Sequence, residues 1–207
     1  MFYITSTPWW LKSIFPKGLT WKGNTAGKTL HLTFDDGPHP EITPFVLDLL
    51  AKANAKATFF CIGENVERYP EVFAQIIKEG HRVGNHTQTH PDGWAMEASA
   101  YLEEIKKADS FIRSNLFRPP YGKITKKQVQ KIRQAFPTMN VIMWSCVAGD
   151  FDTAKNGDWC AGQAIRFARP GNIIVFHDSE KAFPRLEVAL PAVLAHMAKN
   201  SLVSIAL

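Results

Sequence analysis

Cysteine is scarce in this chain of 207 residues, which has three: Cys61, Cys146 and Cys160. None of them forms a Cys-x-x-Cys pair, and each lies in an apolar stretch of sequence. Both observations favour buried free thiols over a disulfide framework or a thiolate metal site. We therefore expect a protein built for a reducing compartment.

Long apolar runs and a secretory leader are also missing. No stretch is long enough to span a bilayer, and residues 1–21 lack a basic start, an unbroken apolar segment and a small-residue cleavage site. These absences predict a cytoplasmic protein with no integral membrane segment, although association with the cell envelope stays open. Trp9, Trp10, Phe15 and Trp21 could anchor the chain at a membrane surface. Packing of an N-terminal arm, residues 1–28, on a domain formed by residues 29–207 is the favoured interpretation.

The sequence has no tract of one charge. The net charge is +5, but Lys and Arg are interspersed with acids along stretches of helical periodicity. This pattern argues against a nucleic-acid surface and allows only mild attraction of anionic polymers. Repeats and low-complexity segments are absent, and no feature indicates a protein partner. The length and the apolar content of 45% fit a single globular domain.

Short β-branched or aromatic runs alternate with helical periodicity from Lys28 onward. The predicted strands are 28–34, 56–63, 82–86, 116–120, 140–145, 171–177 and 201–207. The predicted helices are 43–50, 70–80, 97–114, 125–136, 158–168 and 185–199. Thr43 is expected to cap the first helix, with Pro44 in its first turn, and Gly80 to end the second. Repeated βα units predict a parallel sheet, either open or closed into a barrel.

Reactive side chains follow five of the predicted strands. In chain order they are Asp35, Asp36, His86, His90, Arg118, Asp150 and His177. In α/β folds the carboxyl ends of the strands form the edge at which ligands bind. A barrel brings five such ends to one centre more easily than a flat sheet does. We therefore expect an α/β barrel with its site at this edge.

The segment TFDDGP places two acids side by side. Neighbouring side chains of a strand point to opposite faces, so Asp35 and Asp36 can share a task only where the pleat breaks, as it does at Gly37-Pro38. One acid could then bind a metal while the other faces a water molecule beside it. Spacing alone does not say which acid takes which role. An ordinary turn with helix-capping acids is the alternative for this segment on its own.

The segment NHTQTH supplies two imidazoles four residues apart. His86 and His90 can reach a common ion from one turn or a compact loop, and one Asp completes a His-His-Asp set. Such a set leaves a coordination position open and suits Zn²⁺, although other first-row divalent ions would also bind. The other histidines lack partner acids and are predicted to be surface or packing residues: His31, His39, His81 and His196.

Five segments in order, TFDDGP, HTQTH, RPPYG, WSCVAGDF and VFHD, resemble the motifs of the polysaccharide deacetylases. These are metal-dependent carbohydrate esterases of family 4 with a NodB-homology domain. The resemblance covers Thr29 to the C-terminus and implies a distorted (β/α)7-type barrel in a single domain. It also implies a hydrolase of linear amides that removes N-acetyl groups from peptidoglycan- or chitin-like glycans. The implied cofactor is a divalent metal, Zn²⁺ before Co²⁺ or Ni²⁺.

The resemblance also implies roles on the base side of the reaction. Asp36, His86 and His90 match the family's metal ligands. Asp35 matches the general base that takes a proton from the attacking water, and Arg118 would hold Asp35 through a charge-assisted pair.

On the acid side, His177 matches the general acid that protonates the leaving amine, and Asp150 the residue that adjusts its pKa. The backbone N–H of Tyr121, together with the metal, would stabilise the oxyanion of the tetrahedral intermediate.

The chain departs from the family pattern at three apolar positions. Val147 and Phe151 stand where relatives usually have Asp and Trp in the fourth motif, and Val175 where they have Leu in the fifth. These positions are expected to hold the acetyl methyl group, so the shape of the pocket could differ. Trp94 could stack on a sugar ring, or pack within its own loop.

Two other classes of function stay open. An O-acetyl esterase or small-amide hydrolase of the same fold would keep an identical metal centre. A non-catalytic glycan-binding protein would tolerate loss of Asp35 or His177, and both residues are present.

Overall fold

The structure is a computed structural model that describes residues 13–25 and 27–207. Its strands are β1 (Thr29–Asp35), β2 (Ala57–Cys61), β3 (Arg82–Asn85), β4 (Leu116–Phe117), β5 (Asn140–Val141), β6 (Cys146–Val147), β7 (Ile173–His177) and β8 (Val203–Ser204). Its α-helices are α2 (Ile42–Lys52), α3 (Gly63–Arg68), α4 (Pro70–Lys78), α5 (Ala98–Ile112), α6 (Lys126–Ala135), α7 (Gly157–Arg166) and α8 (Phe183–Lys199). Two 3₁₀ turns, η1 (Gly93–Ala95) and η2 (Pro120–Gly122), complete the set.

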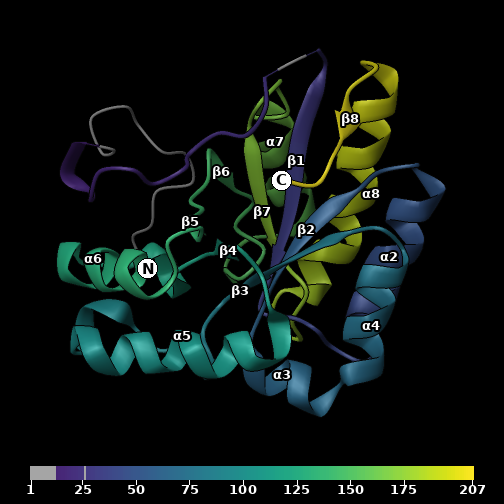
Figure 1. Ribbon diagram of the computed structural model, residues 1–207. Helices are drawn as coiled ribbons and strands as arrows, with labels where there is room; N and C mark the ends of the chain where they lie inside the picture. The colour runs from purple at the N-terminus through teal and green to yellow at the C-terminus, as the bar shows by residue number, and fades with distance from the viewer. Residues whose placement is uncertain (1–12, 26) are drawn as a thin grey trace.

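The strands form one parallel sheet in the order β5-β4-β3-β2-β1-β7-β6, and β8 pairs separately with the start of β1. The sheet curves into a half-barrel with helices around its outside (Figure 1). Residues 142–145 alone separate its two edge strands, β5 and β6, in the chain. This architecture confirms the expected distorted (β/α) barrel in a single domain, left open between β5 and β6.

The central strands β1, β2 and β7 are buried on both faces, as expected for a parallel sheet covered by helices. Residues Leu30–Asp35 of β1 are all buried. The ring of Phe34 stacks on Phe59 of β2 at 5.0 Å and on Phe176 of β7 at 6.0 Å between centroids. The three strands that carry these rings are held in a fixed register, in which Asp35 pairs with both Phe60 and His177.

The order of elements differs from the prediction in two places. The segment 140–145 was expected to be one strand, but only Asn140–Val141 is extended there, and a separate strand follows at Cys146–Val147. The first pairs with β4 and the second with β7, so the chain turns away from one sheet edge and returns at the other. The short helix Gly63–Arg68 was not predicted.

The prediction that Thr43 caps the first helix is wrong. Helix α2 begins at Ile42, and its N-cap residue Glu41 makes no side-chain capping bond. The Thr43 hydroxyl is instead buried, accepts a hydrogen bond from the backbone N–H of His39 and donates one to Asp178. The Thr43 hydroxyl therefore bonds to Asp178, the residue after β7, although sequence alone would assign it to helix capping.

The described part of the N-terminal arm is hydrogen-bonded to the sheet region. The Thr20 N–H donates to the Val141 carbonyl at 2.9 Å, and the Gly23 N–H donates to the Gly171 carbonyl at 2.9 Å. Phe15 packs edge-on against Trp21 at 5.2 Å between centroids. The expectations for Trp9 and Trp10 fall outside the described residues.

The scarce cysteines behave as predicted. Cys61, Cys146 and Cys160 are buried free thiols, and burial raises the pKa of Cys146 and of Cys160 to about 12.

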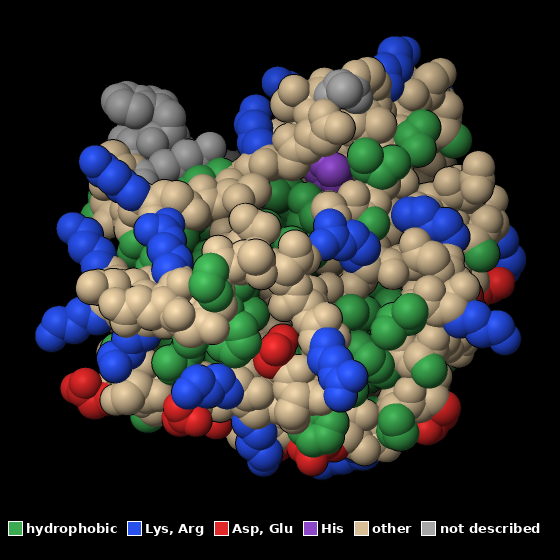
Figure 2. Space-filling view, viewed as in Figure 1, with side chains coloured by type: hydrophobic (Ala, Val, Ile, Leu, Met, Phe, Trp, Pro, Cys, Tyr) green, Lys and Arg blue, Asp and Glu red, His purple; other side chains and the backbone are tan. Residues whose placement is uncertain are grey.

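Figure 2 shows Lys and Arg side chains spread over the viewed face with acids among them rather than in one basic tract. No helix within the described ranges combines the length and apolar character needed to cross a membrane.

Candidate metal and catalytic site

The TFDDGP segment ends β1 in a turn that aims the two acids differently. Asp35 is the last residue of β1, whereas Asp36 has φ 80°, in the left-handed region that few residues other than glycine adopt. The turn is held from three directions. The Asn65 amide donates to the Asp36 carbonyl at 2.7 Å, the Ile62 N–H to the Gly37 carbonyl at 2.9 Å, and the Gly37 N–H to Asp178 at 3.1 Å. The surrounding fold therefore fixes a backbone conformation that Asp36 would rarely adopt alone.

The three predicted metal ligands meet at the carboxyl end of the sheet. One ligand atom each from Asp36, His86 and His90 lies within 4.8 Å of the other two. Asp36 Oδ1 is 3.3 Å from His90 Nε2 and 3.7 Å from His86 Nε2. His86 Nδ1 lies 2.7 Å from the Arg118 carbonyl, which can only accept, so this nitrogen carries the proton and Nε2 presents a lone pair.

The chemistry of this cluster fits a divalent cation. Burial lowers the pKa of His86 and of His90, and for His86 the neighbouring His90 lowers it further against the attraction of Asp36. Neutral imidazoles are the form that binds a metal. The buried Asp36 Oδ1 has no hydrogen-bond partner and faces the imidazole lone pair of His86. Facing acceptors repel one another unless a cation lies between them, so the three residues would hold one together.

Asp35 and Arg118 form a buried ion pair beside this cluster. Arg118 Nη1 donates to Asp35 Oδ1 at 2.6 Å, and the Arg118 side chain is fully buried. The guanidinium also donates to Thr33 Oγ1 and to the Met143 carbonyl, and it lies over the Phe60 ring at 4.0 Å. Burial lowers the pKa of Arg118, and the charge and hydrogen bond of Asp35 oppose that shift. Asp35 is therefore held in a single orientation by a fully enclosed arginine.

His177, at the end of β7, and Asp150, in the turn after β6, form a second acid–base pair. His177 is the register partner of Asp35 on β7, and its Nδ1 lies 2.8 Å from Asp150 Oδ1. The His177 backbone N–H also donates to Asp150 Oδ2 at 2.7 Å. Burial disfavours the imidazolium, but the charge and hydrogen bond of Asp150, with Asp36 and Asp35 beyond it, raise the pKa of His177 to about 10. The proton on Nδ1 is held by Asp150, which leaves Nε2 for other chemistry.

The remaining predicted residues occupy different parts of this edge. Tyr121 has φ 57° in η2, and its ring packs edge-on against His90 at 4.6 Å. Phe151 packs edge-on against His177 at 5.3 Å, and Val175 is buried in β7 two residues before it. Trp94, in η1, is 61% exposed, and Lys123 Nζ lies 5.3 Å from the centre of its ring.

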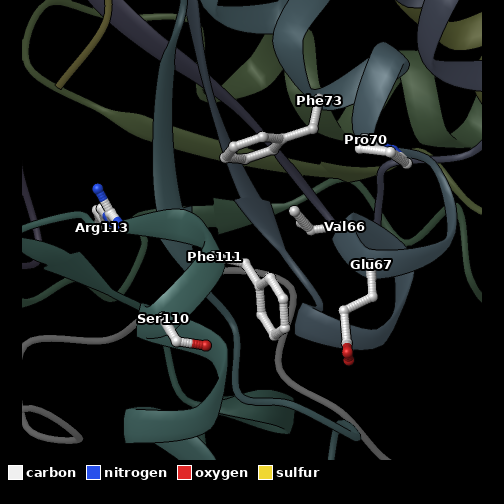
Figure 3. A pocket seen from close by; sticks show the side chains of 7 residues that line it. All are labelled: Val66, Glu67, Pro70, Phe73, Ser110, Phe111 and Arg113. Carbon is white, nitrogen blue, oxygen red and sulfur yellow. The ribbon is translucent and has the colours of Figure 1, made fainter.

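A shallow cavity of about 590 Å³ lies elsewhere on the molecule, between α3, α4 and α5. Figure 3 shows Phe73, Phe111 and Val66 around it, with Glu67 at one side. None of the predicted site residues lines this cavity. The candidate site is therefore defined by its converging side chains and not by the cavity.

Two residues that position the site were not predicted. Asp178 is completely buried, and its carboxylate accepts from Gly37 and Thr43. Its place directly after His177 at the end of a buried strand was the available signal. Asn65, which holds the Asp36 carbonyl, lies in a helix that the sequence did not predict, so no sequence signal indicated it.

A curved parallel sheet that gathers a His-His-Asp cluster, a buried Asp–Arg pair and an Asp–His pair at its carboxyl edge defines a metal-dependent hydrolase of the distorted-barrel type. A family model for polysaccharide deacetylase matches residues 22–138. The chain belongs to this family.

Relatives and solved structures agree with this assignment. A peptidoglycan-N-acetylglucosamine deacetylase of Bacillus cereus is 33% identical over 196 residues, 91% of each chain. A chitooligosaccharide deacetylase of a Bradyrhizobium species is 36% identical over 165 residues, 75% of this chain and 74% of that protein. A crystal structure of a peptidoglycan N-acetylglucosamine deacetylase superposes with a TM-score of 0.86 at 27% identity, covering 97% of this chain and 95% of that one.

Proposed function

We propose that this protein removes N-acetyl groups from amino sugars of a peptidoglycan- or chitin-like glycan, with a divalent metal, Zn²⁺ before Co²⁺ or Ni²⁺, held by Asp36, His86 and His90. The observation that carries the proposal is the arrangement of three units at one sheet edge. The ligand cluster lies beside the buried Asp35–Arg118 pair, and Asp35 and His177 are register partners on adjacent strands. Adjacent strands are ~4.8 Å apart, so a base and an acid can address one amide group.

The metal's part is Lewis acidity: a divalent cation in such a site polarises a carbonyl and lowers the pKa of water. Asp35 accepts the proton of the attacking water, and Arg118 keeps the carboxylate aimed at that position. The N–H of Tyr121 donates to the developing oxyanion, and the left-handed backbone at this residue sets its direction. These roles need no movement of the sheet, because each group stands at the end of a hydrogen-bonded strand or in the turn after it.

The acid side completes the reaction. An amine leaves poorly unless it is protonated, and His177 transfers its Nε2 proton to the amide nitrogen as the carbon–nitrogen bond breaks. Asp150 accepts the hydrogen bond from Nδ1–H of His177 and so stabilises the imidazolium before the transfer. The products are acetate and a free amino sugar. Phe151 and Val175 form the apolar surroundings proposed for the acetyl methyl group.

The test is acetate release by metal-loaded protein from N-acetylglucosamine oligomers, peptidoglycan fragments and O-acetylated sugars. Release from an N-acetylated substrate, lost in Asp35→Asn with metal content unchanged, is the expected result. Release from O-acetylated sugars alone would overturn the proposal in favour of the esterase alternative. No release from any substrate would favour a glycan-binding protein.

A further inference from the structure

We propose that Trp94, Lys123 and Tyr121 form a subsite for an uncleaved N-acetylamino sugar of the same glycan chain as the sugar that reacts. The proposal rests on the deacetylase function above and adds where the rest of the substrate binds. The first observation that supports it is the solvent exposure of two aromatic side chains. Trp94 is 61% exposed and Tyr121 is 58% exposed, although both rings are large and apolar.

The two rings flank one cation. Lys123 Nζ lies 5.3 Å from the centre of the Trp94 ring and 5.6 Å from that of Tyr121. The same ammonium group pairs with the carboxylate of Asp92. This combination of apolar ring faces and a charge-balanced pair suits a neutral sugar, whose C–H face packs on an aromatic ring while its hydroxyl and acetamido groups accept and donate hydrogen bonds.

The turn that presents Trp94 is fixed by hydrogen bonds. Asp92 accepts from the Trp94 N–H at 3.0 Å, and the Gln128 amide donates to the carbonyls of Gly93 at 2.6 Å and Met96 at 3.1 Å. A Cβ atom at Gly93 would lie 2.2 Å from the Lys123 carbonyl oxygen, so only glycine fits this approach. The exposed ring therefore stands on a fixed backbone, which reduces the ordering that a ligand must impose on binding.

A series of contacts joins this platform to the proposed catalytic site. The Tyr121 ring packs against the ligand His90 at 4.6 Å, and Lys123 lies between Tyr121 and Trp94. Two side chains thus stand between Trp94 and the metal ligand. A sugar that stacks on Trp94 could therefore belong to the same chain as the reacting sugar, and Trp94 would contribute to binding only when the chain is long enough to reach it.

The experiment compares wild type with Trp94→Ala on N-acetylglucosamine oligomers of increasing length. We expect wild-type kcat/KM to rise with chain length, and Trp94→Ala to lose roughly 3- to 10-fold in kcat/KM on long oligomers, through KM, with little change on the shortest active one. Trp94→Phe should restore part of the loss. Phe111→Ala is the matched control, because Phe111 is also exposed but lies at the cavity between α4 and α5. Tyr121 is left unchanged, since its backbone belongs to the proposed catalytic machinery.

Equal KM values for wild type and Trp94→Ala at every length would overturn the subsite and leave the deacetylase function intact. If wild type deacetylates nothing, calorimetric binding of an N-acetylglucosamine pentamer to both proteins decides the subsite separately. Binding weakened by Trp94→Ala would then support the subsite while the proposed function fails, and equal binding would overturn both. Thermal unfolding of each variant checks that the fold is retained.

Discussion

Arg118 and Asp35 are joined by a hydrogen bond of 2.6 Å inside the protein, the arginine side chain fully buried and the aspartate side chain 5% exposed. Two strands that are not neighbours in the sheet supply the pair, since Asp35 ends β1 and Arg118 follows β4. The pair therefore ties the base to the opposite side of the half-barrel.

Removal of one partner of this pair should destabilise the fold. Arg118→Met leaves Asp35 buried without its cation, and we expect the free energy of unfolding to fall by about 3–5 kcal/mol. The double variant Arg118→Met/Asp35→Asn should recover a large part of this loss, because the uncompensated charge is gone. Urea unfolding of the wild type, both single variants and the double variant measures the coupling. Additive effects of the two single substitutions would contradict the predicted coupling.

Asp178 is predicted to support metal binding without touching the metal ligands' side chains. Its carboxylate holds the Gly37 N–H and the Thr43 hydroxyl, and so fixes the turn that presents Asp36. Asp178→Ala should weaken metal affinity ~10–100-fold, as loss of an outer hydrogen-bond partner does in other metal sites. Asp178→Asn should lose less, because its amide oxygen can still accept from Gly37. Competition titration with a chromophoric chelator gives the dissociation constants, and unchanged affinity in Asp178→Ala would show that the turn holds without it.

Substitution of the paired acids should separate their roles. Asp36→Asn is expected to lower metal occupancy, because a charged ligand is lost. Asp35→Asn should keep the metal but slow the chemical step ~10²–10⁴-fold, the usual contribution of a general base. Elemental analysis beside single-turnover rates measures both effects. If Asp35→Asn loses the metal instead, the two roles are reversed.

The high-pH limb of the rate profile should report His177. This group must be protonated to act as the acid, so the rate falls as pH rises through its pKa, which the structure raises to about 10. A cation beside Asp36 offsets part of the attraction from the site carboxylates, which places the limb between the ordinary histidine value of ~6.5 and about 10.

Asp150→Asn removes the principal attraction and should move this limb to lower pH, with metal content unchanged. His177→Ala should flatten the limb and lower kcat. The measurement is kcat against pH for the three proteins on one acetylated oligosaccharide. An unaltered limb in His177→Ala would mean that another group donates the proton.

Metal removal should abolish turnover and also lower thermal stability. Chelation is expected to stop acetate release, and Zn²⁺ or Co²⁺ to restore it. A ligand that binds only the folded state at a hundred times its dissociation constant adds ~2.7 kcal/mol of stability, so the melting temperature should rise with metal concentration. Full activity in protein shown by elemental analysis to be metal-free would refute the role of the His-His-Asp cluster.

Residue patterns alone predicted the parallel α/β architecture and most of the candidate site. Alternation of β-branched runs with helical periodicity is a local property, and it located β1, β2, β3 and β7 within a few residues. Because parallel strands end at one edge, placement after those strands predicted that Asp36, His86 and His90 would meet. The resemblance to the family assigned a role to each of them, which spacing alone could not do.

Features that depend on contacts between distant segments could not be predicted from residue patterns. Residues 140–147 form two strands at opposite sheet edges because β4 and β7 offer separate pairing partners, and this is invisible in a run of apolar residues. Thr43 bonds to Asp178 rather than capping a helix, since the turn after β7 reaches it in space. The turn that presents Trp94 is likewise held by Gln128, which is 35 residues from Gly93 in the chain and reaches its carbonyl only in the folded protein.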